Sequence, residues 1–233
     1  MRKLSISILS LLLFISLIFN SGCAKSNDAE PVDGNLQTYE QTAGYSAATM
    51  TDVMGKVIQT ASTLGGVGSS MSSDSPMAFE YNESTGWWTF TISLSILQTA
   101  TIRVQFNDAS GNFHKFYNQN STTSIKSTGE GSGTSGSFSY SFTITQMGNQ
   151  YSAVLVNGSG SVTYQGTSST FSMTNVALNK NQDAIPDGGQ MAVNVQGCAF
   201  TIGFNGSTTI PVTFTYQGHS YTMTVNLATG QIS

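Results

Sequence analysis

The side chains best suited to catalysis are few and lie far apart in this sequence. His114 and His219 are the only histidines, and neither has a Cys, Asp or His at the spacing of metal ligands. Gly131 to Gly136 matches G-x-G-x-x-G, but a strand pattern follows it where a phosphate site needs a helix. The few acid–base candidates are carboxylates: Glu80, Glu83 and Asp108. We therefore predict that the protein is not an enzyme.

The loop from Asn179 to Gln190 is the one stretch whose residue types suit a metal ion. Oxygen-bearing side chains occupy positions 1, 3, 5 and 9 of this loop, as in calcium-binding loops: Asn179, Asn181, Asp183 and Asp187. The stretch resembles the D-x-D-x-D-G-I-P-D repeats of bacterial surface proteins. Only two of the four are carboxylates, so the expected calcium affinity is weak. We therefore favour an Asx-rich connecting loop without metal and expect no cofactor, and weak calcium binding is the alternative.

The N-terminus carries the most specific motif. Arg2 and Lys3 precede an apolar run from Leu4 to Phe19, which is shorter than the roughly 20 residues of a spanning helix and typical of a signal peptide. Ser21, Gly22 and Cys23 follow. They resemble the lipobox of the bacterial lipoprotein signal family, and the resemblance implies cleavage of residues 1–22 and acylation of Cys23. An ordinary signal peptide with a chance cysteine is the alternative.

The resemblance also implies an address and a membrane partner. Ala24 after the cysteine looks like the outer-membrane sorting class, so we expect a lipid-anchored protein of the bacterial envelope, at the outer membrane. Several acyl chains hold a protein stably on a bilayer, whereas one binds only marginally. Acylation of Cys23 would leave Cys198 without a disulfide partner. Cys198 shares its phase with inward residues, which predicts a buried thiol.

Two patterns predict the elements that follow. Residues 23–35 are polar and contain Pro31 and Gly34, which is typical of a flexible tether. Apolar residues then recur at intervals of three and four and predict an amphipathic helix over 36–64. Gly44 and Gly55 could kink it. The stripe consists of Leu36, Tyr39, Ala43, Ala47, Met50, Met54, Val57, Ala61 and Leu64.

The rest of the chain is dominated by two-residue alternation. In Trp87 to Ile96, apolar residues alternate with Ser and Thr, as in a strand with one buried face. Similar segments recur between about 78 and 228 and predict about 11–12 strands. That number favours a mainly β fold: one large, curved antiparallel meander, either a half-barrel or a barrel, packed on the N-terminal helix. We expect residues 36–233 to form a single domain.

Function is predicted less directly than architecture. The charge of -4 and the scarcity of Lys and Arg argue against nucleic acid as a partner. We expect a non-enzymatic protein that binds an apolar or lipid-like ligand between sheet and helix. The residues expected to line that site are Trp88, Phe90, Phe106, Phe142, Phe200, Phe204 and Phe214.

Two alternatives use the same alternation. The first is a structural or surface-interaction module, adhesin-like or carbohydrate-binding, with a solid core and a Ser/Thr/Asn surface. The second is a transmembrane barrel with its apolar residues facing lipid. Trp87 lies on the otherwise polar phase, where it could stack on a sugar ring or pack under a loop.

Overall fold

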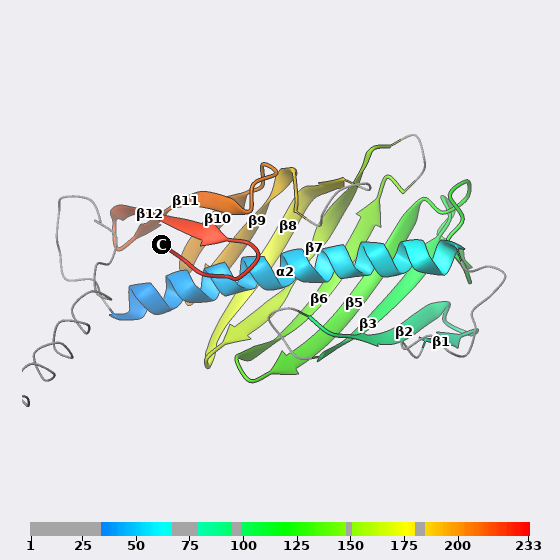
Figure 1. Cartoon of the computed structure of the whole chain (residues 1–233), viewed down its shortest axis with the longest axis horizontal. Coiled ribbons are helices and arrows are strands. Elements are labelled where there is room, and N and C mark those ends of the chain that lie inside the picture. The colour runs from blue at the N-terminus through cyan, green and yellow to red at the C-terminus, as the bar shows by residue number, and fades with distance from the viewer. Residues whose placement is uncertain (1–33, 67–78, 95–98, 148–150, 180–184) are drawn as a thin grey trace, which may run out of the picture.

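The computed structural model describes residues 34–66, 79–94, 99–147, 151–179 and 185–233. They form a helix and a large sheet, with the helix lying across one face of the sheet (Figure 1). The elements are α2 (Gly34–Gly66), β1 (Phe79–Asn82), β2 (Trp87–Ile92), β3 (Thr99–Asn107), β4 (Phe113–His114), β5 (Ser124–Gly133), β6 (Gly136–Thr145), β7 (Ala153–Tyr164), β8 (Thr167–Asn179), β9 (Gly188–Val195), β10 (Cys198–Gly203), β11 (Thr209–Tyr216) and β12 (His219–Asn226).

The sheet is a twelve-stranded antiparallel meander. Its order is β1-β2-β3-β5-β6-β7-β8-β9-β10-β11-β12, and β4 pairs with β3 beside this path. The sheet is not closed, because no pairing joins β1 to β12 among the described residues. The predicted mainly β fold with a helix on a curved, half-barrel-like sheet is confirmed. Alternate connections of a meander lie at the same end of the sheet, which places the hairpin turns in two opposite rows.

Helix α2 fills the inner face of the sheet. Every member of the predicted stripe is buried except Tyr39, which is half-buried. The buried residues of α2 and of the strands form one continuous hydrophobic cluster. The helix therefore supplies the second layer that the apolar face of a sheet requires.

The middle of α2 is buried on all sides, which the stripe alone did not predict. Residues 42–50 are all buried, including Thr42, Ser46 and Thr49. The hydroxyl groups of Thr42 and Ser46 donate to the carbonyl oxygens one turn earlier, at 2.8 and 2.7 Å. These bonds satisfy polar groups that would otherwise be costly to bury.

Gly44 does not break the helix, although the sequence allowed a kink there. The C-terminal turn packs against it, and a Cβ atom at Gly44 would lie 2.7 Å from the carbonyl oxygen of Gly230. Glycine is required at this position by close approach of another backbone. The turn is held by the backbone N–H of Gly230, which donates to Asn226 at 2.8 Å.

Two local features of the strands differ in how well the sequence predicted them. The alternation of polar and apolar residues breaks from Asn175 to Leu178, which indicates a bulge or a strand end, and the structure has a bulge there: the register between β8 and β9 shifts between Thr174 and Ala177. Strand β5 lies in a Ser/Gly-rich stretch whose structure the sequence left open. In the described ranges no helix is both long and apolar enough to cross a bilayer.

Candidate functional site

The seven residues predicted to line an apolar site all lie on the inner face, but in separate places. Trp88 and Phe90 are on β2 and Phe106 on β3. Phe142 is on β6, in the middle of the sheet. The remaining three lie at the far side, on β10, just after it and on β11: Phe200, Phe204 and Phe214.

These side chains are packed rather than exposed. Their exposed fractions range from 0% for Phe106 and Phe200 to 6% for Phe204. Phe200 and Phe214 lie with ring centroids 4.5 Å apart, and Phe142 lies 4.3 Å from the ring of Tyr140. A side chain that lines a cavity wide enough for an acyl chain keeps exposed surface. This packing therefore favours a filled interior.

The predicted calcium loop is only partly described. Asn181 and Asp183 fall outside the described residues. Asn179 is the last residue of β8, and Asp187 is exposed, with its backbone N–H donating to Ala177 at 3.0 Å. No group of three or more His, Cys, Asp or Glu suited to a metal occurs in the described parts of the chain. Both interpretations of this loop, a connecting loop without metal and a weak calcium site, therefore stay predictions.

The structure describes only one of the two cysteines, Cys198. Cys23 lies outside the described residues, so its acylation stays a prediction. Cys198 is a buried free thiol, as its phase predicted. Burial raises the pKa of Cys198, and the nearby Glu40 carboxyl raises it further. A thiol with a raised pKa is a poor nucleophile at neutral pH.

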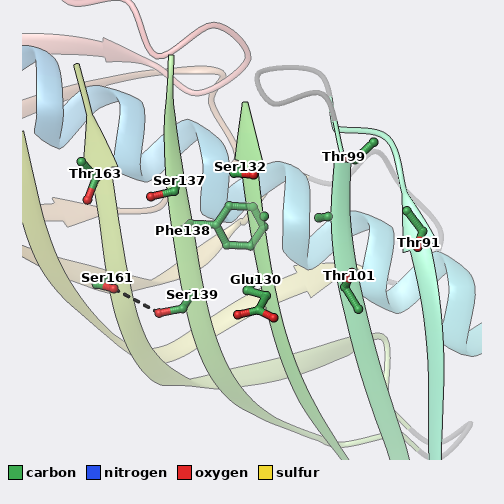
Figure 2. A pocket seen from close by; sticks show the side chains of 12 residues that line it. Thr91, Thr99, Thr101, Glu130, Ser132, Ser137, Phe138, Ser139, Ser161 and Thr163 are labelled. Carbon is green, nitrogen blue, oxygen red and sulfur yellow. Dashed lines mark hydrogen bonds between the residues drawn. The ribbon is translucent and has the colours of Figure 1, made fainter. Parts of the chain in front are cut away.

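A groove lies on the opposite, outer face of the sheet. It consists of three open hollows of about 520, 470 and 160 Å³. The smallest shares Thr101, Glu130 and Ser139 with the largest, and Arg103 and Thr128 with the third. The hollows are therefore contiguous, and we call them together the outer groove. Figure 2 shows its largest part, with α2 behind the sheet.

Strand register explains how the groove is assembled. Arg103 on β3 pairs with Thr89 on β2 and with Thr128 on β5. Thr101, two residues before Arg103 on β3, pairs with Thr91 on β2 and with Glu130 on β5. Arg103 and Glu130 are thus diagonal neighbours, a separation that long side chains can span. Within the described residues, neither side chain takes part in an ion pair or a hydrogen bond.

Hydroxyl groups line the whole groove, and Trp87 adds an aromatic ring at one end. Trp87 is half-buried and lines the hollow that also contains Arg103. At the other end, the hydroxyl oxygens of Ser139 and Ser161 lie 3.1 Å apart across β6 and β7 (Figure 2). The lining thus offers an aromatic ring, one guanidinium, one carboxylate and many neutral hydroxyl groups. The lining hydroxyls belong to Thr85, Thr89, Thr91, Thr99, Thr101, Thr128, Ser132, Ser137, Ser139, Ser161 and Thr163.

Sequence reasoning did not identify this groove. The alternation with Ile102 and Val104 places Arg103 on the outward face of its strand, and Trp87 lies on the polar phase of the preceding strand. Glu130 was missed because it lies in the Ser/Gly-rich segment that forms β5. A weak alternation could have identified this strand and its outward residues. Small residues replace most of the usual apolar ones at its inward positions, which are Ile125, Ser127 and Gly129, and the outward positions are Lys126, Thr128 and Glu130.

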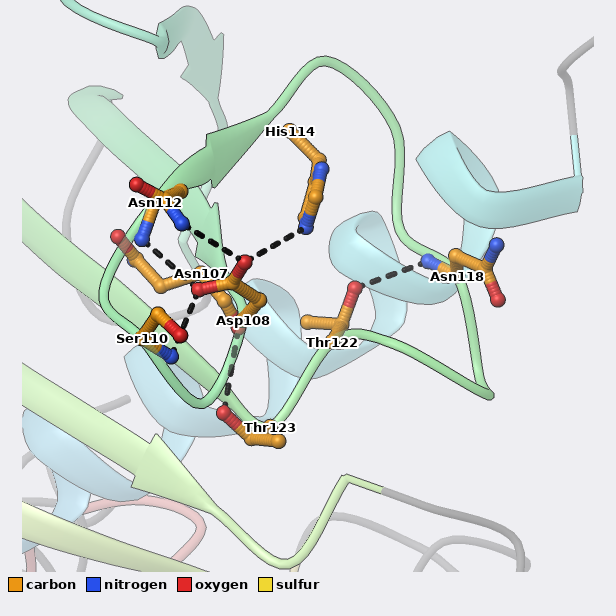
Figure 3. A network of polar contacts seen from close by, with 8 residues as sticks. All are labelled: Asn107, Asp108, Ser110, Asn112, His114, Asn118, Thr122 and Thr123. Atoms are coloured by element: carbon orange, nitrogen blue, oxygen red, sulfur yellow. Dashed lines mark hydrogen bonds and ion pairs between the residues drawn. The ribbon is translucent and has the colours of Figure 1, made fainter.

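Asp108, a predicted acid–base candidate, is instead the centre of a turn (Figure 3). Its carboxylate accepts hydrogen bonds from the backbone N–H groups of Ser110 and Asn112, at 2.9 and 2.8 Å, and from the Asn112 amide at 3.1 Å. Nε2 of His114 lies 3.8 Å from Oδ2 of Asp108. The hydrogen bond from the Asn112 side chain is the main cause of the lowered pKa of Asp108. This carboxylate is therefore a weak base, and its hydrogen bonds stabilise the turn.

Comparison with protein families, with curated proteins and with solved structures finds no match for this chain.

Proposed function

We propose that the protein is a lipid-anchored binding module of the bacterial envelope, whose outer groove binds a carbohydrate. Cys23 carries the lipid, the residues after it form the tether, and the helix-filled sheet is a rigid body. The observation that carries the proposal is the groove that joins Trp87, Arg103 and Glu130 to a row of hydroxyl groups. An aromatic ring beside neutral donors and acceptors suits the apolar face and the hydroxyl groups of a sugar.

The filled interior supports this proposal over an apolar ligand between sheet and helix. Helix α2 covers the inner face, and the seven aromatic residues there keep at most 6% of their surface exposed. The outer groove, in contrast, has open volume, and within the described residues the side chains of Arg103 and Glu130 that line it have no ion pair or hydrogen bond. A solid-core surface module is therefore the better of the two hypotheses.

We propose binding rather than hydrolysis. Most glycoside hydrolases use two carboxyl groups on either side of the scissile bond. Among its described lining residues the groove has only Glu130. The role of Glu130 is therefore to accept hydrogen bonds from ligand hydroxyls, and Arg103 donates to ligand oxygens.

A glycan array followed by titration calorimetry tests the groove. We expect binding of neutral or weakly charged glycans. Trp87→Ala should weaken it about tenfold, because a lost ring contact of about 1.4 kcal/mol corresponds to that factor. Thr213→Ala, on the outer face of β11 and outside the groove, is the matched control. Absence of glycan binding, or equal binding by both variants, would exclude the proposal.

The anchor is tested separately. The wild-type chain should incorporate labelled fatty acid and fractionate with membranes. Cys23→Ser should do neither, because its hydroxyl cannot form the thioether. Membrane fractionation of Cys23→Ser would show that a signal other than this lipid holds the protein.

A further inference from the structure

Three hairpins of the sheet share an unusual turn. In β7–β8, β9–β10 and β11–β12 the two turn residues are Gln and Gly, and both have positive φ. Two-residue hairpins require this geometry and favour Asn at the first position, because a longer side chain rarely adopts positive φ. The φ values of the glutamines are 48°, 50° and 49°, for Gln165, Gln196 and Gln217. Backbone preference alone does not explain glutamine at all three positions.

Each of these glutamines is hydrogen-bonded to a tyrosine. In the outer two hairpins the partner is the preceding residue: Gln165 donates to Tyr164 at 3.3 Å and Gln217 to Tyr216 at 3.2 Å. In the middle hairpin Val195 precedes the turn, and the tyrosine comes from the helix. The hydroxyl of Tyr39 donates to the Gln196 side chain at 3.0 Å. A Gln–Tyr hydrogen bond thus occurs at all three turns, with the tyrosine supplied twice by the hairpin itself and once by α2.

All three pairs lie at one end of the sheet. Neighbouring tips are separated by two strand spacings, about 10 Å. Helix α2 joins this end through its first turns: the ring of Tyr39 lies edge-on to Tyr216 at 6.1 Å, and Tyr45 stacks on Tyr164 at 4.3 Å. We call Tyr39, Tyr164, Tyr216 and the three Gln-Gly turns the tyrosine end.

The tyrosine end has no Lys, Arg, Asp or Glu in its hairpin tips, which are residues 163–168, 195–198 and 215–220. Its three tyrosines are half-buried, and the glutamines are exposed. A tyrosine offers an apolar ring and a polar tip, the combination that is enriched where proteins meet the headgroup layer of a bilayer. Uncharged amides beside it suit a zwitterionic surface.

We propose that the tyrosine end rests on the headgroup layer of the membrane that holds Cys23. This inference depends on the proposed lipid anchor. Gly34 begins α2 eleven residues after Cys23, a length that spans at most about 38 Å. Because a short tether produces an effective concentration in the millimolar range, contacts that are weak in solution become significant. The contact fixes which end of the sheet faces the bilayer.

The test uses the full, lipidated chain on phosphatidylcholine vesicles, with an environment-sensitive fluorophore on Gln217→Cys. The matched control is Ser110→Cys, an exposed turn position at the opposite end of the sheet. We expect blue-shifted emission and loss of iodide quenching at position 217 only. The same two labels on a Cys23→Ser background, without vesicles, should be quenched equally, which shows that the fold itself does not shield position 217.

Vesicle flotation separates the two proposals. Flotation with equal quenching at both positions overturns the contact and leaves the anchor intact, whereas loss of flotation overturns both. Gln165→Cys provides a second labelled tip if Gln217→Cys does not fold, and it should behave in the same way.

Discussion

Gly129 of β5 lies opposite Tyr140 of β6, and the tyrosine ring occupies the space above the glycine. A Cβ atom at Gly129 would lie 2.6 Å from Cε1 of Tyr140. The next inward pair repeats this arrangement, with Gly131 opposite Phe138 and a corresponding distance of 2.5 Å. Glycine therefore lets large rings lie close to the sheet beneath α2. Such rings fill the space between the sheet and α2.

The first prediction concerns this packing. Gly129→Ala should lower the free energy of unfolding by about 1–3 kcal/mol, because the added methyl group overpacks the core. Gly203→Ala is the control, since nothing lies within 4 Å of a Cβ atom there, and it should change stability by less than about 0.5 kcal/mol. Urea unfolding of both variants provides the comparison. Equal stabilities would mean that Tyr140 moves aside without cost.

A second prediction concerns how α2 is held on the sheet. The Ser46 and Ser169 hydroxyl oxygens lie 2.9 Å apart, and each also lies within hydrogen-bond distance of a carbonyl oxygen, of Thr42 and Val162 respectively. Each hydroxyl has one proton. When Ser46 donates to Thr42, Ser169 donates to Ser46, and when Ser169 donates to Val162, Ser46 donates to Ser169. This chain of bonds links the helix to β8 inside the core.

Alanine at either serine should cost about 1 kcal/mol, the usual net value of a hydrogen bond. The double variant should cost less than the sum of the two single variants by about 0.5 kcal/mol or more, because the shared bond is lost only once. Thermal or urea unfolding of the four proteins completes the cycle. Strict additivity would show that the two hydroxyls do not interact.

Two-residue periodicity predicted the strands in which apolar and polar side chains alternate. It did not predict a strand whose inward positions are held by small residues. Strand β2 was predicted because Trp88 and Phe90 alternate with Thr89 and Thr91. Strand β5 was not, because its inward positions include Ser127 and Gly129, whose apolar cover comes from rings on β6. A single-strand pattern cannot show a side chain supplied by the neighbouring strand.

The outer groove was missed for a related reason. Arg103, Glu130 and Trp87 are far apart in the sequence and come together only through the register of β2, β3 and β5. Register depends on turn lengths and on packing of the whole inner face. The helix stripe was predicted correctly, but burial of α2 on its other sides depends on partners distant in sequence, such as Gly230.

The third prediction is a loss of stability at alkaline pH. Burial raises the pKa of Tyr140 well above its usual range, although its hydrogen bond with Ser127 lowers it slightly. Above the ordinary tyrosine pKa of about 10, the unfolded chain releases this proton and the folded chain keeps it. The free energy of unfolding should therefore be fully retained below pH 10 and fall as the pH rises above it.

In Tyr140→Phe the free energy of unfolding should fall less steeply with pH, and the slope should differ from that of the wild type by up to about 1.4 kcal/mol per pH unit, the value for one proton. The exposed Tyr151 provides the control variant, Tyr151→Phe. Chemical unfolding between pH 9 and pH 12 measures both slopes. Identical slopes for wild type and Tyr140→Phe would show that Tyr140 ionises in the folded protein as freely as in the unfolded chain.

The fourth prediction sets helix propensity against close packing at Gly44. Replacing a glycine inside a helix by alanine usually stabilises by about 1 kcal/mol. Here the added Cβ atom would lie 2.7 Å from the Gly230 carbonyl oxygen and 2.9 Å from Cγ2 of Ile232. The C-terminal segment also pairs with β12, through a bridge between Val225 and Ile232. The backbone oxygen cannot move without disturbing that pairing, so we expect the steric effect to exceed the propensity.

Gly44→Ala should therefore destabilise the protein and release its C-terminus, which carboxypeptidase would then digest faster than in the wild type. Gly34→Ala, where nothing lies within 4 Å of a Cβ atom, should leave the digestion rate unchanged. A stabilised Gly44→Ala variant with a protected C-terminus would show that the turn at Gly230 can move away from α2 at little cost, and that burial of the middle of the helix does not depend on it.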